Sequence, residues 1–193
     1  MTVCAKCSHV RVILPQYVLK GGIMRALDVA NYFIANYGGG TEMTNLKLNK
    51  LVYFAQAVSL KQYGVPLFSD EIQAWSYGPV EPEVYHAFQK YGKDVVRHSE
   101  GSCETSAQLG KVARKVMETY GELTAFDLVH ISHREHGAWK SVYRPNESNA
   151  ITHDAIQSSD DGAVENVMGG TLTAGIAHVF ETWPNALRML ENS

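Results

Sequence analysis

The sequence predicts a mainly α-helical protein, folded as a single compact multi-helix domain with at most a minor β component. Two observations lead to this fold class. Apolar residues recur at helical spacing in several segments, and most of these segments end at a glycine. Hydrophobic residues make up 45% and charged residues 19% of the 193-residue chain, so the chain has enough apolar side chains for one core.

The first two helices have the clearest patterns. One begins after Met24, carries apolar residues at helical spacing and ends at a run of glycines. The next is predicted to be capped by Thr44 and stopped by Gly64. This second helix is apolar around most of its circumference, which is typical of a central core helix. Lys47 and Lys50 are expected to belong to its polar face.

The elements that follow are shorter. Residues 65–80 are predicted to form a loop with an extended piece at residues 72–76. A helix then starts with Pro82 in its first turn, where a missing N–H group is tolerated. Further helices or helical turns are predicted over residues 106–121, 124–132, 138–142 and 152–157.

The chain divides into three predicted regions. Residues 24–158 carry the helical pattern and form the domain. Residues 1–23 form an N-terminal extension, either disordered or upstream of a natural start at Met24. Residues 159–193 form a C-terminal extension, a candidate for contact with a partner.

Charge and cysteine content exclude several classes of protein. The chain has 17 Lys and Arg against 20 Asp and Glu, so it lacks the basic field that nucleic-acid binding requires. No apolar run reaches the roughly 18 residues of a membrane span, and the N-terminus has no signal peptide. Three cysteines, an odd number, argue against a disulfide framework and favour a reducing cytoplasm.

Two groups of residues have part of a metal-site pattern. Cys4 and Cys7 have half the spacing of a zinc site, without a second closely spaced pair. His130, His133 and His136 recur every three residues instead of the four that place two histidines on a metal-binding helix face. No nucleophile elbow or phosphate loop is present. The sequence therefore predicts no catalytic residue, no metal and no cofactor, and a metal-dependent hydrolase is the less favoured alternative.

Paired carboxylates occur at residues 70–71 and 160–161, in loops that we expect to be exposed, where solvation accounts for them.

The stretch "AWSYGPVEPEVY" (residues 74–85) gathers Trp75, Tyr77 and Tyr85 around a Gly-Pro break. Two interpretations remain open: a tight corner of the core, or a protein interface, since Tyr and Trp dominate interface energetics. Acidic residues flank the corner at the Gly-Pro break, and they either speed association with a basic partner or serve only as helix caps and solvated groups. These residues are Asp70, Glu71, Glu81 and Glu83.

Several stretches of the sequence, including the one around Trp75, resemble a known family. "MRALDVANYFI", "MTNLKLNKLVYFAQA" and "YGVPLFSDEIQAWSYGPVEPEVYHAFQKYG", which lie within residues 24–92, are similar to the Panacea domain, also called the SocA-like or GepA-type domain. The later "LTAFDLVHISHREHGAWKSVY" resembles the second signature of that family.

The resemblance implies a helical antitoxin module of bacterial or phage toxin–antitoxin pairs. Such a module neutralises a cognate toxin, which is expected to be encoded by an adjacent gene, by binding it directly. An alternative is a proteolytic adaptor that delivers the toxin to a AAA+ protease. The family pattern implies no enzymatic activity. The positions that match its motifs are Leu46, Leu48 and Leu51 together with eleven candidates for the interface or for the fold. These candidates are Lys50, Tyr53, Gln56, Trp75, Tyr77, Gly78, Pro79, Val80, Tyr85, His133 and Trp139.

Overall fold

The computed structural model describes residues 24–101 and 104–163. Over these ranges the chain forms seven α-helices, one 3-10 helix and a small three-stranded sheet, which confirms a mainly α-helical fold with a minor β component. The elements in chain order are α1 (Ala26–Tyr37), α2 (Asn45–Tyr63), β1 (Ile72–Trp75), β2 (Gly78–Val80), α3 (Pro82–Phe88), the 3-10 helix η1 (Gln89–Tyr91), α4 (Ala107–Tyr120), α5 (Ala125–Ser132), α6 (Ala138–Val142), β3 (Ala150–Ile151) and α7 (His153–Ser158).

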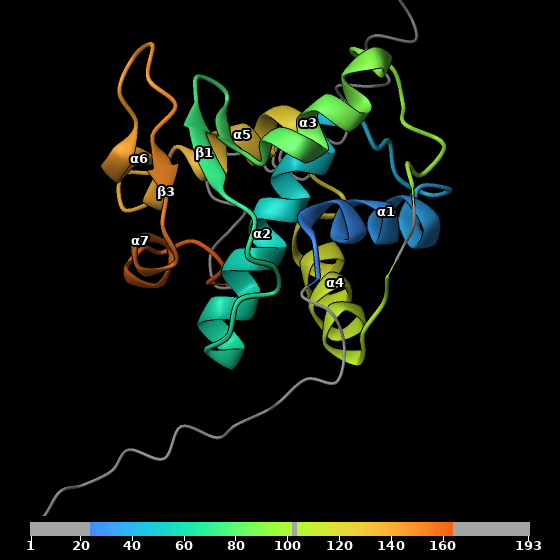
Figure 1. The fold of residues 1–193 in the computed structure, drawn as a ribbon, viewed down its shortest axis with the longest axis horizontal. Helices are drawn as coiled ribbons and strands as arrows, with labels where there is room; N and C mark the ends of the chain where they lie inside the picture. The colour runs from blue at the N-terminus through green and yellow to red at the C-terminus, as the bar shows by residue number, and fades with distance from the viewer. Residues whose placement is uncertain (1–23, 102–103, 164–193) are drawn as a thin grey trace, which may run out of the picture.

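Helix α2 is the centre of the molecule, as its apolar circumference predicts. Nearly every residue from Asn45 to Leu60 is buried, because α1, α3, α4, α5, α7 and β2 all pack against it. In Figure 1, α2 runs through the middle, with α1 and α4 on one side and β1, β3, α6 and α7 on the other.

The prediction that Lys47 and Lys50 belong to a polar face of this helix is wrong. Both are buried, because other elements surround α2 on all sides. Each amine instead donates to a backbone carbonyl 2.8 Å away, Lys47 to Gly121 and Lys50 to Pro79.

The predicted helix ends are confirmed where the sequence has strong capping residues. The Thr44 hydroxyl accepts a hydrogen bond from the backbone N–H of Lys47, and Gly64 ends α2 with a left-handed φ of 69°. Thr124 caps α5 in the same way by accepting from the N–H of Asp127.

The segment predicted as a loop with an extended piece contains a β-hairpin. Strand β1 pairs antiparallel with β2 on one side and with β3 on the other. Trp75 lies opposite Gly78, so Ser76 and Tyr77 form the turn, and Gly78 follows it with φ 98°. Ile72 and Ala74 point into the core, which leaves the alternate side chains of β1 on its outer face.

No helix in the described ranges has the length and apolar composition needed to cross a lipid bilayer. The predicted N-terminal extension, and residues 164–193 of the predicted C-terminal extension, lie outside the described residues.

Candidate protein-binding site

The β1–β2 hairpin and the start of α3 form the corner that contains the stretch of residues 74–85. A groove of about 330 Å³ opens between this corner and the first turns of α2. Its lining includes aromatic and aliphatic side chains and uncharged amides, from Asn45, Leu46, Asn49, Trp75, Ser76, Tyr77, Val80, Tyr85, Gln89 and Gly92.

The groove holds its aromatic side chains in fixed positions. The indole N–H of Trp75 donates to the Gln73 side chain at 2.9 Å, and its ring meets the ring of Tyr85 edge-on with centroids 4.9 Å apart. Tyr77, at the tip of the turn, is 63% exposed. Asn45 fixes the opposite wall, because its amide donates to the Tyr85 carbonyl.

Lys50 holds the hairpin in place through a hydrogen bond to β2. Its side chain is fully buried, and its amine reaches the carbonyl of Pro79 in β2. Burial lowers the pKa of Lys50 to about 7. The amine lies against Gly78, where a Cβ atom would come within 2.6 Å of the Ser132 hydroxyl and 2.9 Å of the Lys50 side chain. The glycine is therefore required by close packing as well as by its φ angle.

The second signature also holds the hairpin in place. The indole N–H of Trp139 donates to the carbonyl of Trp75 at 2.8 Å. The Trp139 ring stacks on His133, with centroids 3.7 Å apart, and on Tyr143. Burial, with a smaller effect from the nearby Lys50 charge, lowers the pKa of His133 to about 4. His133 Nε2 is buried and has no hydrogen-bond partner among the described residues.

The eleven candidate positions therefore fall into two groups. The first surrounds the hairpin: Lys50, Trp75, Tyr77, Gly78, Pro79, Val80, Tyr85, His133 and Trp139. Within this group, only Trp75, Tyr77, Tyr85 and His133 keep exposed or half-buried surface. The second group, Tyr53 and Gln56, is buried farther along α2.

The second group holds loops on the core. The Gln56 amide donates to the Phe68 carbonyl and accepts from the N–H of Leu67, so it fixes the loop before β1. The Tyr53 hydroxyl donates to Asp161 at 2.5 Å. Neither side chain reaches the groove.

Asp161 corrects one expectation from the sequence. It was expected in an exposed loop, but it is 5% exposed and accepts hydrogen bonds from Tyr53 and from the backbone N–H of Ala138. Burial raises its pKa, and these hydrogen bonds act in the opposite direction. Tyr53 lies 108 residues away in the chain. No local sequence pattern predicts the pairing of Tyr53 with Asp161.

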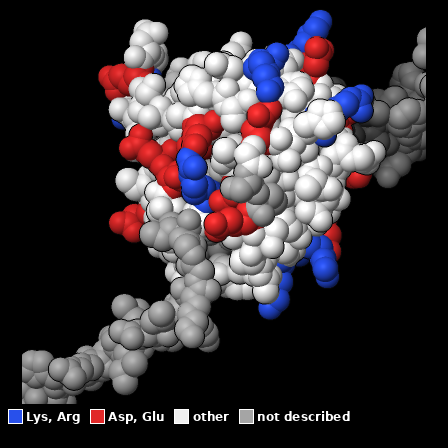
Figure 2. Space-filling model, turned by 45° about the vertical axis from the view of Figure 1, so that its right-hand side comes forward, with Lys and Arg blue, Asp and Glu red and all other residues white. Residues whose placement is uncertain are grey.

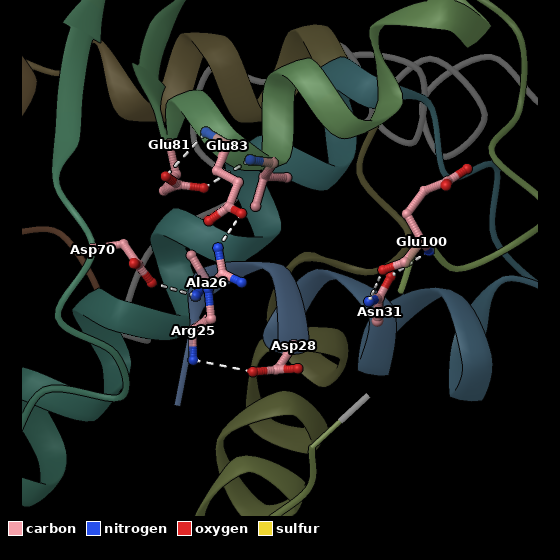
Figure 3. Close-up of polar contacts among 9 residues, drawn as sticks. Arg25, Ala26, Asp28, Asn31, Asp70, Glu81, Glu83 and Glu100 are labelled. Carbon is pink, nitrogen blue, oxygen red and sulfur yellow. Dashed lines mark hydrogen bonds and ion pairs between the residues drawn. The ribbon is translucent and has the colours of Figure 1, made fainter. Parts of the chain in front are cut away.

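The acidic residues beside the corner have separate roles. Glu81 caps α3 by accepting from the N–H groups of Glu83 and Val84, and Asp70 accepts from the first N–H of α1 at Ala26 (Figure 3). Helix capping accounts for these two. Glu71 is exposed, and Glu83 is half-buried in an ion pair with Arg25.

Metal ligands do not gather in the described part of the chain. There, no three His, Cys, Asp or Glu side chains come close enough to hold a metal ion. His130 is exposed and His133 lies under Trp139. Cys4 and Cys7, the half zinc site of the sequence, lie outside the described residues.

The fold is thus a helical body built on one central helix, with an uncharged aromatic groove at a clamped hairpin. Residues 48–140 match the family described as antitoxin SocA-like, Panacea domain. The chain is also 33% identical to antitoxin SocA of Caulobacter vibrioides (strain NA1000 / CB15N) over 112 residues, which cover 52% of this chain and 60% of that protein. No solved structure matches the chain. Over residues 48–140 the chain is therefore similar to the SocA-like Panacea family.

Sequence reasoning missed the residues that build the groove wall and support the hairpin. Asn45 and Asn49 carry a weak signal, since two amides four residues apart share one helix face. Ser132 lies in the second signature, but nothing local predicts its role, which depends on the absence of a side chain at Gly78.

Proposed function

We propose that this chain is the antitoxin of a toxin–antitoxin pair and neutralises its toxin in the cytoplasm by binding it directly. The observation that carries the proposal is the Panacea match over residues 48–140, together with the similarity to an antitoxin. The groove supports it, because exposed Tyr and half-buried Trp side chains are the usual anchors of protein interfaces.

The mechanism proposed is occlusion of the surface that the toxin needs for its activity. A stable complex of this kind buries roughly 1,600 Å² in total, about 800 Å² from each partner. The rigid hairpin suits this role. Trp75 is held by Gln73 and Tyr85 before any partner arrives, so little side-chain freedom is lost on binding.

The test uses the open reading frame next to this gene in the source genome. That frame is induced in a bacterial host alone and together with this chain, and colonies are counted. We expect few colonies when the frame is expressed alone and normal numbers on co-expression. A harmless neighbour, or one that still kills when this chain is abundant, contradicts the proposal.

The same assay separates occlusion from delivery to a protease. In a host strain deleted for its AAA+ proteases, occlusion still rescues growth, and the two proteins co-purify. An adaptor loses its rescue in that strain, and the toxin accumulates.

A further inference from the structure

The side chains that line the groove carry no formal charge. The residues that line it, all within the described ranges, include no Asp, Glu, Lys or Arg. Its polar groups are partly satisfied: the Trp75 indole N–H bonds to Gln73, and the Asn45 amide bonds to the Tyr85 carbonyl. An aliphatic or aromatic side chain can therefore enter without breaking these hydrogen bonds.

Negative charge begins at the edge of this groove. On the outer face of β1, the Gln73 amide joins Trp75 to Glu71, donating to the Glu71 carboxylate at 2.9 Å. On α3, Glu83 is two residues before Tyr85 and pairs with Arg25. Figure 2 shows acidic side chains clustered on one face of the molecule around a basic one.

Among the described residues, three carboxylates act on Arg25, and it forms an ion pair with one of them. The hydrogen bond that Arg25 donates to Glu83 raises the pKa of this guanidinium most, and the charges of Glu83, Asp70 and Asp28 raise it further. Figure 3 shows Asp28, Asp70, Glu81 and Glu83 placed around Arg25. This face, with Glu71, is called the acidic face below.

Charge selects the kind of partner that can cover the groove and the acidic face together. A second copy in a twofold contact would bring the same acidic face against itself, and like charges in contact are unfavourable. Nucleic acid is repelled for the same reason. A protein surface rich in Lys or Arg, with an apolar side chain beside it, complements both features.

We propose that the partner protein inserts an apolar side chain into the groove beside Tyr77 and lays a basic segment against Glu71 and Glu83. This inference rests on the proposed function, because the partner is the toxin. The groove provides affinity and the acidic face speeds association. Since backbone N–H groups already bond to Asp28, Asp70 and Glu81, the two carboxylates that meet the partner are Glu71 and Glu83.

The groove is tested with Tyr77→Ala and the matched control Tyr63→Ala. Both tyrosines are exposed, 63% and 46%, and Tyr63 lies at the far end of α2, outside the groove. The probe is the purified product of the adjacent frame, with affinity measured by calorimetry. We expect Tyr77→Ala to raise Kd by roughly tenfold or more and Tyr63→Ala to leave it unchanged. Equal effects of the two variants overturn the groove assignment.

The acidic face is tested with the double variant Glu71→Lys, Glu83→Lys and the control Glu118→Lys. Glu118 is an exposed residue of α4, near Tyr37. We expect the double variant to slow association by roughly tenfold at low salt, with the difference shrinking as salt rises. An association rate that is unchanged, or that rises, overturns the basic-partner assignment. Thermal melts of every variant establish that each is folded.

Growth rescue by the wild-type chain distinguishes a failure of the surface assignment from a failure of the proposed antitoxin function. If the wild type rescues growth and binds, while these variants behave like the wild type, the surface assignment is wrong and the antitoxin function stands. If the wild type neither rescues nor binds, the proposed function fails. If sedimentation shows self-association that Tyr77→Ala abolishes, a second copy covers the groove and the inference is overturned.

Discussion

The amine of Lys50 lies 2.8 Å from the carbonyl oxygen of Pro79, and this contact joins the central helix to the edge strand of the sheet. The lysine is fully buried. Within the described residues no Asp or Glu lies within ion-pair distance of it. A charged ammonium is costly there, and burial lowers its pKa to about 7.

We therefore expect the free energy of unfolding to rise between about pH 7 and pH 10. In that window the unfolded state, with an ordinary lysine pKa of about 10.4, binds a proton that the folded state has released. A single group of this kind adds up to about 1.4 kcal/mol per pH unit. Above about pH 10 the rise should stop, because the pKa of buried Tyr53 is raised and the unfolded state loses that proton first.

Urea unfolding at several pH values, followed by circular dichroism, measures this slope. Lys50→Met should flatten it, whereas Lys61→Met, on the exposed end of the same helix, should keep it. A wild-type curve that is flat from pH 7 to 10, or a Lys50→Met curve as steep as the wild type, contradicts the expectation.

Gly78→Ala should destabilise the protein for two reasons. Its φ of 98° strains any residue with a Cβ atom, at a cost of about 1–3 kcal/mol, and the new methyl group would meet Ser132 and Lys50. Gly64→Ala is the matched control, since Gly64 has φ 69° but nothing within 4 Å of its Cβ position. We expect Gly64→Ala to show only the strain, and the larger loss to belong to Gly78→Ala.

The contribution of the contact between the new methyl group and Ser132 can be isolated by adding Ser132→Ala to Gly78→Ala. Removal of the hydroxyl should restore part of the stability of Gly78→Ala, with a coupling that unfolding measurements on the single and double variants can detect. If the two substitutions are additive, Ser132 does not limit the space at Gly78.

Much of this fold follows from local sequence signals. Thr44, Gly64 and Thr124 end helices where their chemistry requires it, and α2 is central because its apolar residues surround it. The burial of Lys47 and Lys50 does not follow, because a lysine normally indicates exposure and only the tertiary arrangement supplies carbonyl partners.

Some residues of the candidate groove stand in motifs of the sequence, but the division of roles among them does not follow from those motifs. Trp75 and Tyr77 stand in a recognisable motif, and their place at a groove agrees with one of its two interpretations. The contact of Trp139 with Trp75 joins two signatures 64 residues apart. No periodicity or spacing within either signature predicts that contact.

His133→Phe should leave the free energy of unfolding at pH 7 unchanged or raise it. The substitution keeps an aromatic ring on Trp139 and removes a buried nitrogen that has no partner among the described residues. It should also reduce the loss of stability as pH falls from about 6.5 to 4, where the unfolded state of the wild type takes up a proton that folded His133 resists.

Unfolding curves across this range test the expectation, with His98→Phe, at an exposed position, as the control. A large loss of stability for His133→Phe at pH 7 would show that the imidazole makes a polar contact that matters.

Trp139→Ala and Trp75→Ala should separate the support of the hairpin from its outer surface. Trp139 is buried, stacks between His133 and Tyr143, and bonds to the Trp75 carbonyl, so its truncation should cost about 3–5 kcal/mol. Trp75 is only half-buried. Its truncation should cost about 1–2 kcal/mol, because less apolar surface leaves the core.

The loss of growth rescue should be larger for Trp75→Ala than for Trp139→Ala, the opposite of the order expected for the loss of stability. At a temperature where both variants are mostly folded, we expect Trp75→Ala to lose rescue and Trp139→Ala to lose it only in proportion to its unfolded fraction. Urea unfolding and colony counts on the same variants measure the two effects. If Trp75→Ala is as unstable as Trp139→Ala and its rescue falls only with folding, then Trp75 is a core residue and the partner contacts another surface.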